Sequence, residues 1–411
     1  MVQNSEKVRL AGSRSQYRKT ANLLFTSFLR FSDVIGQSRT KAFLQQLHQG
    51  GRVPHALLLL GPTGSGSLAL ALAMAQLLQC EKASGEADMF GASEPLTEPC
   101  GQCGACRKAQ QFIHPDIHFS YPVVKKKDDR PAVSTDYAAE WRTALNTNPY
   151  LDVNQWLQSI NAENKQGNIN KDECNAIIKK LSLKVFEGRY KILLMWLPEH
   201  LGNEGNRLLK LIEEPPEQTV FLLVAEAQDR ILNTILSRCQ LVKTDPLSDD
   251  EVVDGLKRLR GLDEQRCRQL AFLADGNLNA ALAMADNPEV DDSHMLIDWM
   301  RKCYRGFGPD LVKCTEDFAK LGRENQKQFL HYSLYFLREI MGFVVKSYTP
   351  PRLRQEEMQP AQNMAKLLGF DQVDRMAKLL NNNIYHIERN ANPKVLFLDT
   401  SIKMNRIFKN N

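Results

Sequence analysis

The chain lacks several features that would assign it to a common class of protein. No run of about 18 apolar residues occurs in it, so no segment is long enough to cross a membrane as a helix. The net charge is only +5, and no stretch combines clustered basic and aromatic residues, so the composition does not argue for nucleic-acid binding. Repeats and low-complexity tracts are also absent. The 411 residues, 43% of them hydrophobic and 25% charged, are expected to form two or three globular domains.

Acidic residues are scarce in the first segment of the chain. Residues 1–27 contain one acid, Glu6, and are rich in Ser and Arg. An organellar transit segment has this composition, but a disordered leader before the first domain has it as well, and we favour the second interpretation.

Cysteine is sparse outside one short region. Five of the nine cysteines are scattered, as is common for buried thiols in a reducing compartment. The four grouped ones are Cys80, Cys100, Cys103 and Cys106. Four thiolates at this spacing suit a tetrahedral zinc ion with no open ligand position, which predicts a structural metal. An iron–sulfur cluster is the alternative, but the trailing Cys-Pro of a ferredoxin run is missing. His114 and His118 lie nearby and are not needed as ligands.

Residues 56–73, ALLLLGPTGSGSLALALA, resemble a phosphate-binding loop that lacks its lysine. Its glycines are Gly61, Gly64 and Gly66. They preserve the backbone half of the site, in which N–H groups at a helix N-terminus attract phosphate. Lys followed by Ser or Thr normally binds the phosphates and magnesium, and here Ser67 and Leu68 stand in those places. We therefore expect no tight binding of ATP with magnesium.

The strand that should end in catalytic acids also lacks them. In KILLMWLPEH, 191–200, the strand ends in Trp196 and Leu197, and Glu199 arrives only after a proline. Phosphoryl transfer depends on charge neutralisation and positioning. Loss of the lysine, the hydroxyl and the acids together predicts a catalytically inactive site.

Apolar strands alternate with helical patterns in the first half of the chain, which predicts an α/β layer with a parallel sheet. The expected strands are 56–60, 117–121, 191–196, 220–225 and 240–243. The polar segment 124–170, which contains Lys125–Lys127, is interpreted as an inserted excursion outside the core. After Pro246 the pattern is helical, and Ser248 to Glu251 reads as a capping box at a helix start. Asn287-Pro288 is a plausible boundary between two helical blocks.

Three stretches together resemble a known family. They are FSDVIGQ at 31–37, RVPHALLLLGPTGSG at 52–66, and GNRLLKLIEEPPEQTVFLLVAEAQDRILNTILSRCQ at 205–240. In this combination they are similar to the clamp-loader branch of the AAA+ ATPases, and specifically to subunits of the bacterial DNA polymerase III clamp loader. IERNANPKVLFLDTSIKM, 387–404, resembles the last helices of the collar domain of such subunits.

The resemblance implies an AAA+ module over 28–246, with a zinc module at 80–106 and the insert 124–170. A helical lid over 247–288 and an all-α collar over 289–411 would follow it. In the family, the Arg of the SRC motif reaches the ATP phosphates of the neighbouring subunit, and Arg238 matches that position. Asn279 stands where active relatives carry a lid arginine. Members of the family also carry a zinc module at this place in the chain.

The function expected from the resemblance is that of a non-catalytic stator in a cytoplasmic, replisome-associated clamp loader. Its partners would be gamma/tau-type ATPase subunits and a delta-type clamp-opening subunit, and through the complex the sliding clamp and primed DNA. Two alternatives remain open, an active AAA+ motor with an unusual phosphate loop and a zinc-stabilised DNA-binding module on an ATPase scaffold. A motor would show Lys-Thr after Gly66 and Asp-Glu near 196–197, and neither pair is present.

Overall fold

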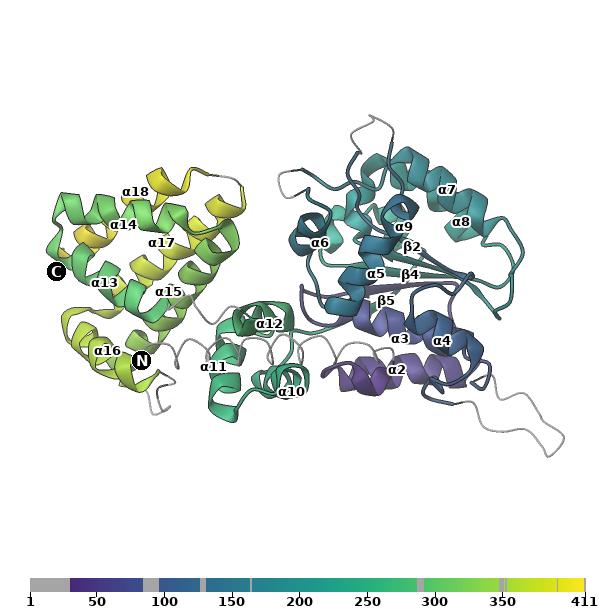
Figure 1. Cartoon of the computed structure of the whole chain (residues 1–411), viewed down its shortest axis with the longest axis horizontal. Coiled ribbons are helices and arrows are strands. Elements are labelled where there is room, and N and C mark those ends of the chain that lie inside the picture. Colours follow the sequence, from purple (N-terminus) through teal and green to yellow (C-terminus); the bar gives the residue numbers. More distant parts are fainter. Residues whose placement is uncertain are drawn as a thin grey trace, which may run out of the picture. The chain divides into compact units, whose positions relative to one another are not determined.

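The computed structural model describes residues 30–83, 96–125, 131–162, 165–286, 292–346, 351, 353–389 and 391–409. The expected leader, 1–27, and the expected boundary at 287–288 lie outside these residues, as do two lysines of the run 125–127. The chain divides into two compact units, Met1–Leu282 and Ala283–Asn411 (Figure 1). The assignment of a lid and a collar by residue range stays a prediction.

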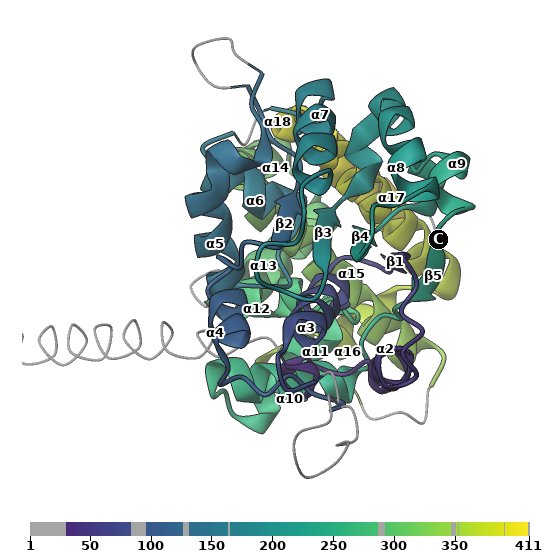
Figure 2. The ribbon, with the colours of Figure 1, turned by 90° about the vertical axis from the view of Figure 1, so that its right-hand side faces the viewer.

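The first unit is built on a parallel sheet. In the described part of the unit, five strands pair in the order β2-β3-β4-β1-β5, which Figure 2 shows from one end. The strands are β1 (Ala56–Leu60), β2 (Ile117–Ser120), β3 (Lys191–Trp196), β4 (Thr219–Ala225) and β5 (Gln240–Lys243). The predicted α/β class is confirmed, and the predicted strand ends agree to within one residue. Strand β1 lies between β4 and β5, and all three run parallel. The loop after β1 therefore lies at the carboxyl edge of the sheet, where α/β proteins place their ligands.

Helices cover both faces of this sheet (Figure 1). One face is packed by α3, which contacts β1, β3 and β4. The other is packed by a cluster that includes Ile177 and Leu181 of α7 against Leu193, Phe221 and Leu223 of the strands. The helices of the unit are α2 (Ser38–Gln49), α3 (Ser67–Gln79), α4 (Gly104–Gln110), α5 (Ala138–Thr147), α6 (Val153–Ser159), α7 (Lys171–Leu181), α8 (Leu209–Glu213), α9 (Asn233–Leu236), α10 (Asp249–Arg260), α11 (Glu264–Ala274) and the first part of α12 (Leu278–Asp286). Short 3-10 segments cover Phe31–Asp33, Ser134–Tyr137, Pro198–Leu208 and Gln228–Arg230.

The described residues of the segment 124–170 include buried core residues, so the prediction that this segment lies outside the core was wrong. Trp141 and Trp156 are 1% and 0% exposed, and Tyr150 is 2% exposed. The ring of Trp141 stacks on Tyr121 at 4.1 Å between centroids and lies 5.2 Å from that of Trp196. The segment was misjudged because a few large aromatic rings supply its buried area, while polar residues dominate its composition.

Helix α10 begins where the sequence predicts a helix start. Ser248 Oγ accepts from the N–H of Glu251 at 3.3 Å, and Glu251 Oε2 accepts from the N–H of Ser248 at 2.8 Å. This reciprocal pair is the expected capping box, and it starts α10. Gly255 of α10 brings the helix against Ile35 and Leu278, which joins α10 to the segment before α2 and to α12.

The second unit consists of helices in its described residues. They are α13 (Asp292–Arg305), α14 (Gly308–Lys320), α15 (Arg323–Val344), α16 (Gln355–Leu367), α17 (Phe370–Glu388) and α18 (Pro393–Lys409), which follow the last part of α12. Their core contains an aromatic stack in which Phe397 lies 3.9 Å from Phe318 and 4.7 Å from Trp299. Trp299 Nε1 donates to Ser401 Oγ at 2.9 Å, so the one polar atom of the indole is satisfied inside this core.

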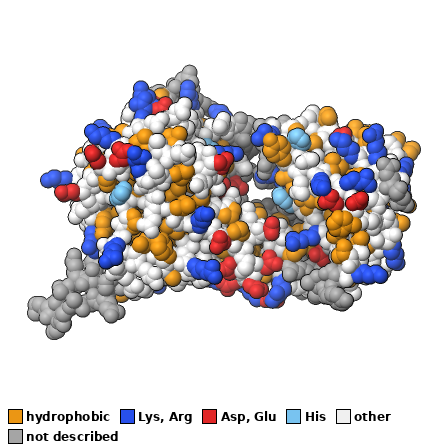
Figure 3. All heavy atoms as spheres, turned by 180° about the vertical axis from the view of Figure 1, so that it is seen from behind, with side chains coloured by type: hydrophobic (Ala, Val, Ile, Leu, Met, Phe, Trp, Pro, Cys, Tyr) orange, Lys and Arg blue, Asp and Glu red, His pale blue; other side chains and the backbone are white. Residues whose placement is uncertain are grey.

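The surface carries charges of both signs. On the face shown in Figure 3, Lys and Arg side chains are interspersed with Asp and Glu, and no single sign dominates a broad area. This distribution agrees with the mild net charge of +5. None of the described helices combines the length and the apolar character that a membrane span requires.

Candidate functional site

The glycines of the phosphate-like loop are required by packing within the chain. A Cβ on Gly61 would lie 1.8 Å from Thr244 Oγ1, and one on Gly66 would lie 3.2 Å from Tyr150 Cε1. Gly66 also has φ of 96°, a conformation that side chains other than glycine rarely adopt. The turn therefore keeps its glycines for reasons that do not involve a phosphate.

Ser67, at the position of the usual lysine, is turned into the protein. Its Oγ lies 2.6 Å from Thr244 Oγ1 and 3.1 Å from Ser65 Oγ, so the three hydroxyls form a buried cluster behind the loop. Leu68 is 5% exposed and offers no metal ligand. The first turn of α3 thus presents neither a cation nor a magnesium ligand.

The space in front of the loop is filled by the protein itself. Pro149, Tyr150 and Leu151 line it from the far side, and the remaining cavity is only about 20 Å³, room for about one water molecule. Tyr150 is fixed at both ends, since its ring packs over Gly66 and its Oη accepts from the N–H of Ile35 at 2.9 Å. We call residues 148–152 the plug.

The plug is also joined to the helix that would carry a lid arginine. Asn148 Nδ2 donates to Asn279 Oδ1 at 2.6 Å, and Asn279 Nδ2 donates to Asp152 Oδ2 at 3.4 Å. Asn279 is 3% exposed. The Leu278 N–H donates to the carbonyl of Gly64 at 3.3 Å. In this arrangement Asn279 binds the plug, and the start of α12 contacts the loop directly.

The carboxylate that follows β3 is engaged with the backbone. Trp196 is 2% exposed and lines the small cavity. Glu199 Oε1 accepts from the N–H groups of Glu226 and Ala227 at 2.5 and 2.8 Å. Glu199 therefore ties the end of β3 to the end of β4, which is a structural use of this carboxylate.

Glu226 is an acid that the sequence did not single out. It follows β4 directly and lines the cavity beside the phosphate-like loop. Burial is the main cause that raises its pKa from 4.5 to about 7, and the charges of Glu199 and Asp152 add to this effect, whereas a hydrogen bond with Thr63 opposes it. No motif marked it, because its raised pKa comes mainly from burial, which depends on the fold.

Arg238 lies just after α9, in the middle of the SRC motif. It forms an ion pair with Glu213 at the end of α8, and its Nη1 donates to the carbonyl of Thr234 at 2.7 Å. The side chain is 33% exposed, and its Nε has no hydrogen-bond partner in the described structure. The side chain is therefore partly accessible in the isolated chain, whereas its Nε is buried.

The four predicted cysteines come together. The sulfurs of Cys80, Cys100, Cys103 and Cys106 all lie within 4.8 Å of one another. Cys100 Sγ and Cys106 Sγ are 3.9 Å apart, close to the sulfur separation of a tetrahedral site with bonds of about 2.3 Å. None of the four is in a disulfide. The donor set therefore fits a tetrahedral thiophilic metal ion.

Backbone donors around the cluster favour negative sulfur. The N–H of Cys100 lies 3.3 Å from Cys80 Sγ. The N–H of Cys103 lies 3.4 Å from Cys100 Sγ, and the N–H of Cys106 lies 3.4 Å from Cys103 Sγ. A hydrogen bond with the side chain of Cys106 is the main cause that lowers the pKa of Cys80 to about 5. Thiolates are the form that binds metals.

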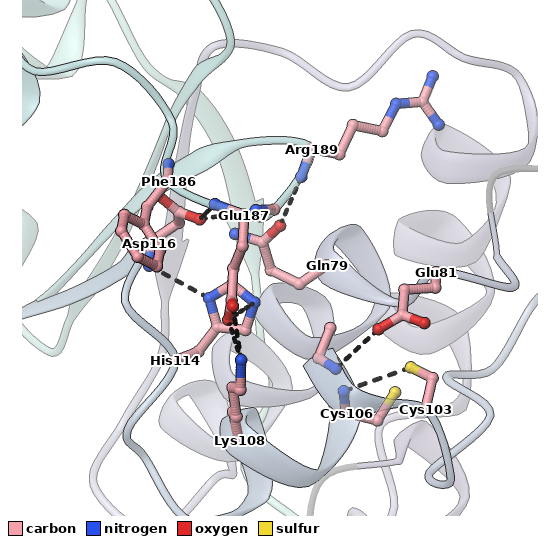
Figure 4. Close-up of polar contacts among 12 residues, drawn as sticks. Gln79, Glu81, Cys103, Cys106, Lys108, His114, Asp116, Phe186, Glu187 and Arg189 are labelled. Atoms are coloured by element: carbon pink, nitrogen blue, oxygen red, sulfur yellow. Dashed lines mark hydrogen bonds and ion pairs between the residues drawn. The ribbon is translucent and has the colours of Figure 1, made fainter.

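The cysteine cluster is connected to the sheet through α4 and the loop before β3 (Figure 4). Glu81 accepts from the N–H of Ala105 at 3.0 Å, and Lys108 pairs with Glu187 at 2.7 Å. Asp116 accepts from three backbone N–H groups of residues 186–188 at 2.7 to 2.9 Å. Burial alone would raise the pKa of Asp116, but the hydrogen bonds from these three N–H groups have the larger effect, and the pKa is lowered.

The plug is the part of the site that sequence reasoning missed. Its only sequence signal is an aromatic residue between Pro149 and Leu151 inside a polar stretch. Such a residue is common in loops, and nothing local indicates that Tyr150 meets Gly66, which is 84 positions earlier in the printed sequence.

Known proteins resemble the chain mainly over its first unit. DNA polymerase III subunit gamma of Buchnera aphidicola is 24% identical over 263 residues, which are 62% of this chain and 58% of that protein. Subunit delta' of Bacillus subtilis is 25% identical over 258 residues, 62% of this chain and 61% of that protein. The chain therefore spans less than two thirds of the length of these relatives. Among solved structures, the RuvB Holliday junction branch migration motor of Thermotoga maritima aligns over 79% of this chain and 80% of its own, with 15% identity and a TM-score of 0.37.

A protein family covers the part of the chain that holds the loop, the cysteine cluster and the SRC motif. Residues 36–248 match the family described as DNA polymerase III, delta subunit. This match extends over more than half of the chain, which belongs to the DNA polymerase III delta subunit family as a clamp-loader subunit of the delta' type.

Proposed function

We propose that the chain is a non-catalytic, stator-like subunit of a clamp loader. It assembles with gamma/tau-type ATPase subunits and a delta-type subunit, and the whole complex loads a sliding clamp onto primed DNA in the cytoplasm. The helical second unit serves as its collar. The chain neither binds ATP tightly nor hydrolyses it.

The plug carries this proposal. Tyr150 and its neighbours occupy the space that a nucleotide would need, and about 20 Å³ is left. Asn279 binds Asn148 of the plug, whereas a nucleotide-binding lid would offer a cation to phosphate. A lid held by contacts within the chain does not open and close with nucleotide. Rigidity of this kind suits a stator.

Arg238 is the group that the chain contributes to catalysis in this proposal. A guanidinium placed beside a neighbour's ATP stabilises the charge that develops during phosphoryl transfer. Donation requires Arg238 to leave Glu213, and the exposure of the pair to water makes that exchange inexpensive. The SRC motif and the partial exposure of the side chain support this assignment.

The cysteine cluster has a structural role in this proposal. Cys80, Cys100, Cys103 and Cys106 would hold a zinc ion, which fixes the start of α4 against the end of α3. With four protein ligands no position stays open for water or substrate. The metal therefore contributes folding energy and no chemistry.

Reconstitution tests the proposed function. The full chain is co-purified with candidate ATPase and delta-type subunits, and ATP turnover is measured with and without it, with a sliding clamp and primed DNA present. We expect no turnover by the chain alone and stimulated turnover by the complete complex. DNA-stimulated turnover by the isolated chain that disappears on mutation of residues 61–67 would instead identify it as a motor subunit.

A further inference from the structure

The residues around the cysteine cluster contact the segment that leads into α2. We call residues 80–83 and 96–106 the cysteine module, and residues 30–37 the entry segment. The entry segment contains the 3-10 turn Phe31–Asp33 and ends where α2 begins. Phe31 and Ile35 are each 0% exposed, so the segment is packed into the first unit.

Glu98, two positions before Cys100, connects the module to the entry segment. Its Oε2 accepts from the N–H of Phe31 at 2.9 Å, and its Oε1 accepts from the N–H of Ser32 at 3.0 Å. Gln45 Nε2 of α2 donates to the same Oε1 at 3.2 Å. One carboxylate therefore satisfies two backbone donors at the start of the turn and joins that turn to α2.

Two further contacts join the module to the same part of the fold. His48 Nε2 of α2 donates to the carbonyl of Ala83 at 3.0 Å. A Cβ on Gly101 would lie 2.6 Å from Arg30 Nη2, so the guanidinium of Arg30 lies against the turn that carries the cluster. Both parts of the module, which supply different cysteines to the proposed metal site, therefore contact the entry segment or α2.

The entry segment in turn holds the plug. The N–H of Ile35 donates to Tyr150 Oη at 2.9 Å, and the ring of Tyr150 packs over Gly66. Ile35 lies four residues after Phe31, whose N–H is bound by Glu98. A set of contacts thus runs from the cysteine module, through the entry segment, to the loop that the plug covers.

We propose that a metal ion in the cysteine module controls how firmly the plug is closed. The bound metal cross-links the four cysteines and contributes folding energy to the module. The module then holds Glu98 where its carboxylate orders the entry segment, and the bond between Ile35 and Tyr150 passes this order to the plug. The inference rests on the structural zinc of the proposed function and does not depend on the stator role.

Hydrogen exchange of the full chain tests the proposal. Peptides that cover residues 31–37 and 148–152 are followed in the zinc-loaded protein, after removal of zinc with a chelator, and in Glu98→Ala with zinc bound. The amides of the plug are the decisive ones, because Glu98 does not bind them directly. Glu187→Ala is the matched control, since the carboxylate of Glu187 binds Lys108 of α4 and not the entry segment. Zinc is measured by elemental analysis in every sample.

We expect Glu98→Ala to keep its zinc and to exchange the amides of the plug about tenfold faster, because local opening of the plug then costs less free energy. Zinc removal should have the same effect in the wild type, should add little in Glu98→Ala, and should be reversed when zinc is returned. Glu187→Ala should exchange as the wild type does.

Three results would overturn the proposal. Slow exchange of the plug in zinc-loaded Glu98→Ala would show that the module does not act through this carboxylate, and this result decides even if the chelated chain unfolds as a whole. Equal acceleration by chelator in the wild type and in Glu98→Ala would mean that the metal acts by another route. Wild-type protein without zinc would remove the metal itself, whereas the stator role would still be tested by reconstitution.

Discussion

Arg238 and Glu213 form an ion pair that joins the SRC motif to the end of α8. Both side chains are partly exposed, at 33% and 42%. A pair of this exposure contributes little stability. It therefore acts mainly as a holding contact for the guanidinium, which a stronger phosphate partner can replace.

The first prediction concerns this arginine. Arg238→Ala in the reconstituted complex should lower turnover at the neighbouring ATP site by on the order of 10³-fold, because the charge of the transferred phosphoryl group loses its stabiliser. Turnover is measured by phosphate release under saturating ATP, and assembly is checked by size-exclusion chromatography. Arg230→Ala, an exposed arginine eight positions earlier, is the control and should leave the rate unchanged. A wild-type rate in the Arg238→Ala complex rejects the finger role.

Glu213→Gln separates the holding contact from the finger itself. The variant keeps the shape of the side chain and removes the charge that pairs with Arg238. Turnover of the complex should not fall, because the arginine is then freer to reach its partner. A loss as large as that of Arg238→Ala would mean that the ion pair, and not the arginine alone, forms the active arrangement.

The second prediction concerns the metal. Protein purified without chelator should contain one equivalent of zinc, and Cys106→Ser should lose it together with much of the thermal stability, since a structural metal site contributes folding energy. Zinc is measured by elemental analysis and unfolding by calorimetry. Cys174→Ser, a change at a buried cysteine outside the cluster, is the control and should keep the metal. Less than half an equivalent of zinc in the wild type would remove the assignment.

Much of the fold could be predicted because its signals are local. Each strand is a short apolar run closed by turn residues, and Ser248 with Glu251 marks a helix start within four positions. The cysteine cluster was predictable for the same reason, since three of its members fall at two-residue gaps. Arg238 was identified from the SRC motif, and its ion pair with Glu213 is seen only in the structure.

The contents of the candidate site were less predictable because they depend on contacts between distant segments. The absence of Lys after Gly66 indicated that ATP binding is weak, but not that Tyr150 fills the space. Asn279 was read as a missing cation, whereas its bonds to Asn148 and Asp152 give it a use of its own. Hydrophobic periodicity identifies helices and strands, but it does not indicate which distant loop an aromatic ring packs against.

The third prediction separates the two features that we expect to prevent ATP binding. Ser67→Lys with Leu68→Thr restores the residues of a phosphate loop, yet it should not restore ATP binding, because the plug still fills the site. Adding Tyr150→Gly to these changes opens the space and should give measurable binding in equilibrium dialysis with labelled ATP. Tight binding after the first two changes alone would show that the plug is not an obstacle.

The plug should also contribute stability by itself. Tyr150→Ala removes a ring that is 2% exposed and should lower the free energy of unfolding by about 3 to 5 kcal/mol. Tyr150→Phe keeps the ring and removes only the acceptor of the Ile35 N–H, so it should cost about 1 to 3 kcal/mol. Chemical unfolding followed by fluorescence measures both. Equal losses in the two variants would mean that the hydroxyl, and not the ring, holds the plug.

The fourth prediction concerns pH. Burial raises the pKa of Glu226 from 4.5 to about 7, so the folded chain binds its proton more tightly than the unfolded chain does. Stability from this group is therefore fully present below pH 4.5 and is lost as the pH rises toward 7, by roughly 3 kcal/mol in total. Glu226→Gln stays neutral and should flatten that part of the stability profile, measured by urea unfolding between pH 5 and 8. Glu217→Gln, at an exposed acid before β4, should leave the profile of the wild type in place, and a wild-type slope in Glu226→Gln would show that another group titrates.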